Sequence, residues 1–134
     1  MAGVPQAQAL SVLVVDDHRP MLKLVDTHLR NLGFSDIDTV DDPLAAITMC
    51  RRKPYGLILS DWRMKPIDGL GLLKAVRADE RLADVPFVMI TAEIERENVQ
   101  KAKAAGVNGY IAKPFDHAQL KAKLQAILPV GTIL

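Results

Sequence analysis

The sequence predicts an α/β domain built around a parallel sheet of five strands. Short apolar runs alternate along the chain with longer segments in which apolar residues recur at helical spacing. Three of the runs, VLVV, LILS and FVMI, contain no alternating polar residues, which is typical of strands covered by helices on both faces. We therefore expect the order strand then helix, repeated five times.

The five predicted strands are Ser11–Val15, Asp36–Val40, Gly56–Ser60, Pro86–Ile90 and Gly109–Ala112. The first helix begins at about Arg19 and ends before Gly33, a residue that commonly terminates helices. The second runs from Pro43 to Arg52, with Asp42 as its N-cap. The remaining helices cover about Leu70–Ala78, about Ile94–Ala105, and a segment from near Asp116 to Leu128.

Length and composition indicate a single domain over residues 1–134, with a core at about 10–128 and short tails at both ends. Hydrophobic residues make up 49% and charged residues 25%, which argues against disorder and against a membrane span. Seventeen basic and sixteen acidic residues give a net charge of +1, which offers little attraction for nucleic acid or an anionic bilayer. No long apolar heptad pattern appears, so we expect a monomer.

Cysteine and histidine are too sparse for a disulfide or a zinc site. Cys50 is the single cysteine, and His18, His28 and His117 are scattered along the chain, so surface or helix-end positions are expected for the histidines. The first ten residues lack the basic and apolar regions of a secretory signal. These features predict a cytoplasmic location.

Polar residues of chemically useful types follow four of the predicted strands directly. Asp16 and Asp17 follow the first strand, Asp61 the third, Thr91 the fourth and Lys113 the fifth. Because the carboxyl ends of parallel strands share one edge of the sheet, where ligands bind in such folds, we expect these side chains to converge.

Three neighbouring carboxylates repel one another, so a cation is expected among them. An all-oxygen ligand set favours a hard ion such as Mg²⁺, and Lys113 would supply a second positive charge. A metal and a lysine beside a carboxylate suit phosphoryl transfer, which makes Asp61 a candidate nucleophile. Each residue alone could instead be a helix cap, a turn residue or a solvated charge. Suitable residues directly after four separate strands make coincidence the poorer explanation.

Several longer motifs resemble the response-regulator receiver family, and within it the CheY-like single-domain chemotaxis regulators. The resemblance covers about residues 10–128 and rests on VLVVDD at 12–17, SDWRMKPIDG at 60–69, KAVRAD at 74–79, VMITAE at 88–93 and KAKAAGVNGYIAKPF at 101–115. It implies a flavodoxin-like, doubly wound (βα)5 fold with strand order 2-1-3-4-5.

The resemblance also implies roles for the acidic residues. Asp61 would accept a phosphoryl group from the phosphohistidine of a histidine kinase, and small donors such as acetyl phosphate should also work. Mg²⁺ would be held by Asp17, Asp61 and the backbone carbonyl of Arg63, with Asp16 acting through a metal-bound water. The protein would be a binding switch that catalyses only its own phosphorylation and dephosphorylation.

Further residues would carry the switch. The resemblance implies that Thr91 and Lys113 would contact the phosphoryl oxygens. After phosphorylation, Thr91 would draw its loop inward. An aromatic residue at the position of Tyr110 then turns inward and remodels the surface formed by helix four, strand five and helix five. From the strand pattern alone, a half-buried Tyr110 with a solvated hydroxyl is the expectation. The Lys113-Pro114 bond is expected to be cis, as in the family.

The sequence departs from the family pattern near the acceptor. Lys65 stands where a proline is usual and Pro66 follows, so the loop is expected to bend differently with metal binding intact. Arg63 and Glu93 carry opposite charges at positions that flank the path of attacking water. We hypothesise that they pair and slow hydrolysis of the acyl phosphate by excluding water. Alternatively, the Arg63 cation weakens Mg²⁺ binding by repulsion.

The predicted output is binding to another protein, for which the resemblance suggests the flagellar motor switch. A phosphorelay shuttle, a phosphate sink or a binding module that is never phosphorylated remain alternatives. A flavodoxin-like cofactor binder is disfavoured because Asp16 and Asp17 would repel a phosphate. An aspartyl phosphatase would normally place an acid where Arg63 stands.

Overall fold

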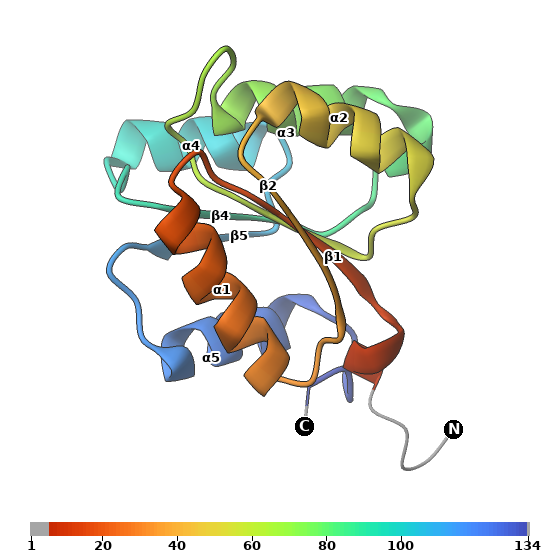
Figure 1. Cartoon of the computed structure of the whole chain (residues 1–134). Coiled ribbons are helices and arrows are strands. Elements are labelled where there is room, and N and C mark those ends of the chain that lie inside the picture. Colours follow the sequence, from red (N-terminus) through yellow and green to blue (C-terminus); the bar gives the residue numbers. More distant parts are fainter. Residues whose placement is uncertain (1–5, 134) are drawn as a thin grey trace.

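Five parallel strands form one sheet in the order β2-β1-β3-β4-β5 (Figure 1). The computed structural model describes residues 6–133. The strands are β1 (Ser11–Val15), β2 (Asp36–Val40), β3 (Leu57–Ser60), β4 (Phe87–Thr91) and β5 (Gly109–Ala112). In the register of the three neighbouring strands, Val12 lies opposite Ile37 on one side and Leu57 on the other. The predicted fold class and strand order are confirmed.

Helices cover both faces of the sheet (Figure 1). The helices α1 (Arg19–Asn31) and α5 (His117–Ile127) lie on one face. The other face carries α2 (Pro43–Arg52), α3 (Gly69–Ala78) and α4 (Arg96–Ala104). Within residues 6–133, none of these helices has both the length and the apolar character needed to cross a membrane.

The central strands contribute side chains to two separate apolar cores. Val12 and Val14 pack with residues of α1 and α5, whereas Leu13 and Val15 pack with residues of α2 and α3. Successive residues of a strand point to opposite faces, so a strand with both faces covered needs apolar residues at every position. This explains the unbroken apolar runs of the sequence.

Some element boundaries differ from those predicted. β3 begins one residue later than Gly56, and β4 is displaced by one residue so that it includes Thr91, which pairs with Ala112 of β5. Pro86 has no backbone N–H with which to join a sheet ladder. The fourth helix begins at Arg96, because the amide of Ile94 bonds instead to the carbonyl of Ala92 in the preceding turn.

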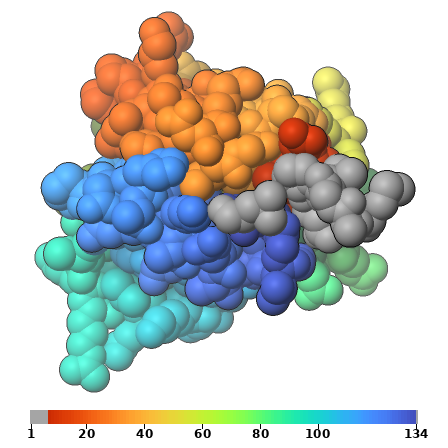
Figure 2. All heavy atoms as spheres, turned by 90° about the horizontal axis from the view of Figure 1, so that it is seen from below, coloured from red at the N-terminus to blue at the C-terminus, as the bar shows by residue number. Residues whose placement is uncertain are grey.

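Buried residues are also found just outside residues 10–128, at both ends of the described part of the chain. The short 3₁₀ helix η1 (Gln6–Ala9) places Ala7 in the core beside α1, and the amide of Ala7 donates to the carbonyl of Thr132 at 3.1 Å. Ile133 is also buried. Figure 2 shows this side of the molecule, with the first described residues in red and the last in dark blue. The outermost tail residues, 1–5 and 134, lie outside the described part.

Arg77 joins three elements on the α3 side of the sheet. Its guanidinium donates to the carbonyls of Leu82 and Gly106, at 3.2 and 3.0 Å, and to the side chain of Asn108 at 2.8 Å. The Asn108 oxygen also accepts the amide of Phe87, the first residue of β4. Burial lowers the pKa of Arg77 from its ordinary value. This one cation therefore connects α3, the 3₁₀ helix η2 (Glu80–Leu82) and the segment after α4.

Candidate functional site

Three carboxylates meet at the carboxyl edge of the sheet. Asp16 and Asp17 follow β1 directly and Asp61 follows β3, the neighbouring strand. Each offers an oxygen, and these oxygens all lie within 4.8 Å of one another. Asp16 is buried, Asp61 is half-buried and Asp17 is exposed. The parallel topology thus brings together the residues that the sequence places after separate strands.

Asp16 is the most enclosed of the three acids. One of its oxygens accepts the backbone amide of His18 at 2.9 Å and the other accepts the Lys113 ammonium at 3.0 Å. Burial raises the pKa of Asp16 above its usual value, with the charge of Asp61 as a smaller contribution in the same direction. The larger cause of the raised pKa is thus the removal of water, and repulsion between the carboxylates is the smaller one.

Lys113 supplies the positive charge at the base of the cluster. Its Nζ lies 3.0 Å from an oxygen of Asp16 and 3.4 Å from Oδ2 of Asp61, and its side chain is only 17% exposed. The Lys113-Pro114 bond is cis, as predicted. Since the lysine follows β5 at the far edge of the sheet, the long side chain spans the carboxyl end of β4 to reach the acids.

The backbone around Asp61 is closely confined. Oδ1 of its carboxylate accepts the amide of Trp62 at 2.7 Å, and its backbone carbonyl accepts the hydroxyl of buried Ser60 at 2.9 Å. Gly69, the first residue of α3, lies against the same carbonyl, so a Cβ built on Gly69 would be 2.1 Å from that oxygen. Ser60 and Gly69 were not singled out from the sequence, because no spacing rule reports this contact.

The loop after β4 connects the site to Tyr110. The Thr91 hydroxyl oxygen accepts the amide of Glu93 at 3.1 Å, which uses a lone pair and leaves the hydroxyl proton free to be donated. The Tyr110 hydroxyl donates to the backbone carbonyl of Glu93. Burial, with smaller contributions from the charges of Glu93 and Asp61, raises the pKa of Tyr110 to about 12. Tyr110 is half-buried as expected, but its hydroxyl bonds to protein.

Arg63 and Glu93 form an ion pair across the mouth of the site. The Arg63 side chain is 81% exposed, whereas that of Glu93 is 16% exposed and also accepts the amide of Asn98 at 3.4 Å. The Lys65-Pro66 bond in the same loop is cis. The expected pairing is therefore present; its influence on hydrolysis and the metal-binding role of the Arg63 carbonyl remain predictions.

A shallow hollow of about 430 Å³ lies beside the acids, between the loops after β3 and β4. Asp17, Trp62, Arg63 and Glu93 are among the residues that line it. Trp62 is 8% exposed and packs in the core with residues of α3.

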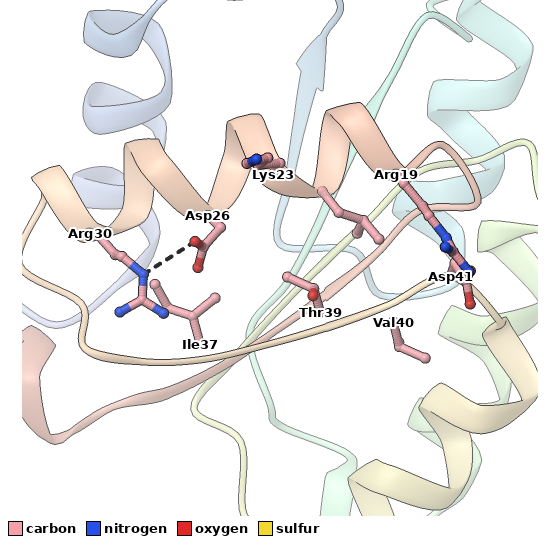
Figure 3. A pocket seen from close by; sticks show the side chains of 9 residues that line it. Arg19, Lys23, Asp26, Arg30, Ile37, Thr39, Val40 and Asp41 are labelled. Carbon is pink, nitrogen blue, oxygen red and sulfur yellow. Dashed lines mark hydrogen bonds and ion pairs between the residues drawn. The ribbon is translucent and has the colours of Figure 1, made fainter.

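A second hollow, of about 560 Å³, lies between α1 and the edge strand β2, apart from the acidic cluster (Figure 3). Its charged side chains largely pair with one another. Arg19 binds Asp41 and Arg30 binds Asp26, each at 3.2 Å. Asp41 follows β2 directly but is paired with Arg19, whereas three carboxylates converge at the acidic edge, which therefore remains the candidate site.

The donor set of the acidic cluster fits Mg²⁺. All candidate ligands are oxygens, and hard divalent ions prefer oxygen ligands. Among residues 6–133, this is the one group of three or more acidic, histidine or cysteine side chains whose ligand atoms converge in this way. The raised pKa of Asp16 indicates that its charged form lacks full compensation, which a bound cation would supply.

Comparison with known sequences identifies similar proteins over nearly the whole chain. The family model described as "Response regulator receiver domain" matches residues 12–125. Chemotaxis protein CheY-3 of Vibrio cholerae serotype O1 is 45% identical over 118 residues, which cover 88% of this chain and 91% of that protein. Chemotaxis protein CheY of Pseudomonas aeruginosa PAO1 is 41% identical over 118 residues, covering 88% and 95% of the two chains.

Solved structures give the same result. Chemotaxis response regulator CheY4 of Vibrio cholerae superimposes with a TM-score of 0.83 at 31% identity, covering 89% of this chain and 98% of that one. The receiver domain of the sensor histidine kinase PA1611 from Pseudomonas aeruginosa PAO1 gives a TM-score of 0.80 at 31% identity, covering 88% and 96%. That structure was solved with a magnesium ion coordinated in its active site cleft.

Proposed function

Because the chain belongs to the response regulator receiver domain family, we propose that it is a Mg²⁺-dependent phosphorylation switch whose acceptor is Asp61. The observation that carries the proposal is the convergence of Asp16, Asp17, Asp61 and Lys113 at one edge of the sheet. The donor would be a phosphohistidine of a histidine kinase, met in the cytoplasm. As a switch, the protein would turn over no substrate other than its own phosphoryl group.

In the proposed transfer, a carboxylate oxygen of Asp61 attacks the phosphorus of the donor. The N–P bond of the phosphohistidine breaks as the O–P bond of an aspartyl phosphate forms, and the released imidazole takes a proton from solvent. The Trp62 amide orients one oxygen of the acceptor, and the Lys113 ammonium stands beside the other. Lys113 is placed to stabilise negative charge on the transferred phosphoryl oxygens.

The proposed metal ligands are Asp17, Asp61 and the backbone carbonyl of Arg63, with Asp16 acting through water. When bound, Mg²⁺ would balance the charge of the carboxylates and of the phosphoryl oxygens. The close contacts of Ser60 and Gly69 with the Asp61 carbonyl hold this part of the loop in place. A rigid acceptor loop suits a reaction that depends mainly on positioning.

The proposed signal passes from Thr91 to the surface formed by α4, β5 and α5. Thr91 keeps a hydroxyl proton to donate to a phosphoryl oxygen, and any inward movement of Thr91 also moves Glu93, whose amide it holds. Glu93 in turn holds the Tyr110 hydroxyl. A hollow of about 460 Å³ lies beside Tyr110, between β5 and α5. This surface is the proposed docking site for a downstream protein such as the flagellar motor switch.

The Arg63–Glu93 pair is proposed to slow hydrolysis of the aspartyl phosphate. It spans the mouth of the site, where water must approach. Substitution Arg63→Asn should shorten the phosphoryl lifetime, measured as the decay of the adduct after donor removal. An unchanged lifetime would contradict this role. If the Arg63 charge instead weakens metal binding, the same variant will bind Mg²⁺ more tightly in a fluorescence titration of Trp62.

The test of the proposed function is intact mass after incubation with acetyl phosphate, with and without Mg²⁺. We expect one phosphoryl adduct that requires Mg²⁺ and is absent from Asp61→Asn. Asp68→Asn is the matched control, because Asp68 is a nearby exposed acid that caps α3, and asparagine also caps helices. Absence of any adduct, together with Trp62 fluorescence that responds to neither Mg²⁺ nor beryllofluoride, would leave only a binding module.

A separate experiment tests the output. The beryllofluoride-treated chain should bind its downstream partner more tightly than the untreated chain, and a substitution in the α5 part of the hollow, Ala122→Glu, should abolish the difference. A chain that is phosphorylated normally but shows no difference in binding would favour the phosphorelay shuttle or phosphate sink.

A further inference from the structure

Two histidine side chains meet between α1 and α5, away from the acidic cluster. His28 lies in the last turn of α1 and His117 is the first residue of α5. Their Nδ1 atoms are 3.0 Å apart, and both rings are partly buried. Figure 2 shows α1 and α5 side by side on the underside of the molecule. Nothing in the proposed phosphoryl chemistry uses this pair.

The geometry is that of a hydrogen bond between ring edges. The ring centroids are 5.1 Å apart, and the ring planes are inclined by 28°. The centroid distance is close to the 3.0 Å between the nitrogens plus one ring radius at each end. The two nitrogens therefore lie near the line that joins the rings. The rings therefore meet through their nitrogen edges rather than through their faces.

Counting protons shows when this bond can exist. One Nδ1 must carry a proton and the other must offer a lone pair. A neutral pair meets this condition, and so does a pair with one imidazolium, in which the bond is charge-assisted. When both rings are imidazolium, two N–H groups face each other at the observed separation and no bond remains. The hydrogen bond therefore persists when the neutral pair binds one proton and is lost when the pair binds a second.

In the part of the chain that the structure describes, no carboxylate on α5 or at its cap pairs with either ring. Asp116 precedes His117, but its carboxylate accepts the amide of Gln119 as the helix cap. Lys121 lies one turn further along α5 and is itself a cation. The dipole of α5 also disfavours a cation at its first residue.

The groups on α1 and in the loop before α5 do not stabilise a second proton on the pair either. The residues one turn from His28 along α1 are apolar or uncharged, and the nearest acid in that helix, Asp26, binds Arg30. Phe115 contributes an apolar ring, with its centroid 5.7 Å from that of His28. Burial, and then the charge of His117, lower the pKa of His28 below its usual value.

We propose that His28 and His117 form a pH-sensitive tie, which holds the start of α5 against α1 at neutral pH and releases it on acidification. The tie matters because α5 begins four residues after Lys113 and forms part of the surface described above. Loosening the start of α5 changes the order of the segment that leads from Lys113 into the helix. The proposal does not depend on phosphorylation and is tested on the unphosphorylated full chain.

The first experiment is an NMR titration of the imidazole signals. In the wild type, His28 should titrate below the ordinary histidine pKa of about 6.5. In His117→Gln, His28 should titrate at a higher pKa than in the wild type, because the neighbouring ring is gone. Identical titration of His28 in the presence and absence of His117 would overturn the proposal.

The second experiment is a double-mutant cycle with His28→Gln, His117→Gln and the double variant, using urea unfolding. The coupling should favour the folded state by about fivefold near pH 8, as for one net hydrogen bond, and should vanish near pH 5. His18→Gln replaces the third histidine, which is exposed, and should show no coupling to His117 at either pH. Equal coupling near pH 8 and near pH 5 would contradict a proton-dependent tie.

The third experiment uses hydrogen exchange to test whether the histidine pair acts at the start of α5. The amide of Leu120 bonds to the carbonyl of Asp116 in the first turn of α5. Its hydrogen-exchange protection, corrected for the intrinsic dependence on pH, should fall several-fold on acidification in the wild type. The double variant should show no such fall. Protection that changes equally in both proteins would show that the histidines do not control the start of α5.

Discussion

Gly69 permits the first turn of α3 to lie directly against the loop that contains Asp61, and its replacement by alanine should disturb both stability and the site. A Cβ at this position would lie 2.1 Å from the Asp61 carbonyl oxygen and 2.9 Å from the sulfur of Met89. Real Cβ atoms essentially never approach heavy atoms closer than 3.0 Å, so α3 or the carbonyl must move by about 0.9 Å.

The size of the effect follows from two opposing terms. Forcing a methyl group into a filled core costs about 1–3 kcal/mol. Replacing a glycine within a helix returns about 0.5–1 kcal/mol, mainly through the unfolded chain. We therefore expect Gly69→Ala to lower the free energy of unfolding by about 1–2 kcal/mol. Because displacements of about 1 Å can reduce rates about 100-fold, autophosphorylation should suffer more than stability does.

The assay pairs urea unfolding with the rate of adduct formation from acetyl phosphate. Gly71→Ala is the control in the same helix, since a Cβ there meets its nearest neighbours at 3.4 Å. That variant should be as stable as the wild type or slightly more stable, with normal phosphorylation. The reasoning is refuted if Gly69→Ala matches Gly71→Ala in both measurements, because the close approach at Asp61 would then have no consequence.

Three further predictions concern the rest of the domain. Tyr55→Phe removes the hydroxyl that donates to Asp38 at 2.6 Å and should cost about 1 kcal/mol by urea unfolding. Because this bond is the largest cause of the lowered pKa of Asp38, the cost should be complete above about pH 3.8 and disappear as pH falls through the lowered pKa. Arg77→Met should lower the free energy of unfolding by about 2 kcal/mol through loss of its three hydrogen bonds, whereas exposed Arg52→Met should change it by less than about 0.5 kcal/mol. The Cys50 thiol, buried and with a pKa raised to about 11, should react slowly with thiol reagents in the native protein and rapidly in urea; fast native labelling would contradict its burial.

The sequence predicts the elements of this fold well because each has a local cause. Asp42 accepts the amide of Leu44 and Pro43 opens α2, as the capping rule expects. Strand positions followed from apolar runs, with errors of one residue at Gly56, Pro86 and Thr91. Strand order was different in kind. It came from the resemblance to a family, since an alternating pattern of strands and helices does not specify which strands are neighbours.

The residues of the acidic cluster could be predicted from the sequence, but the contacts made by helix packing could not. The positions of Asp16, Asp61 and Lys113 after their strands indicated one edge of the sheet, and the structure brings them together there. The contact of Gly69 with Asp61 was not predictable, because it depends on how closely α3 approaches β3. The meeting of His28 and His117 was equally hidden, since 89 residues separate them and helix packing alone brings them together.

The bond between Ala7 and Thr132 makes the backbone almost a closed ring. Both residues lie near the amino ends of the strands, whereas Asp61 lies at the carboxyl ends. They meet because α5 returns the chain to the side on which β1 begins. A short linker between the ends would therefore complete the ring without crossing the acidic edge, and the chain could be opened elsewhere. A circular permutant cut in the turn after α2 should keep the same sheet and the same acceptor loop, although Asp61 would then lie near the beginning of its sequence.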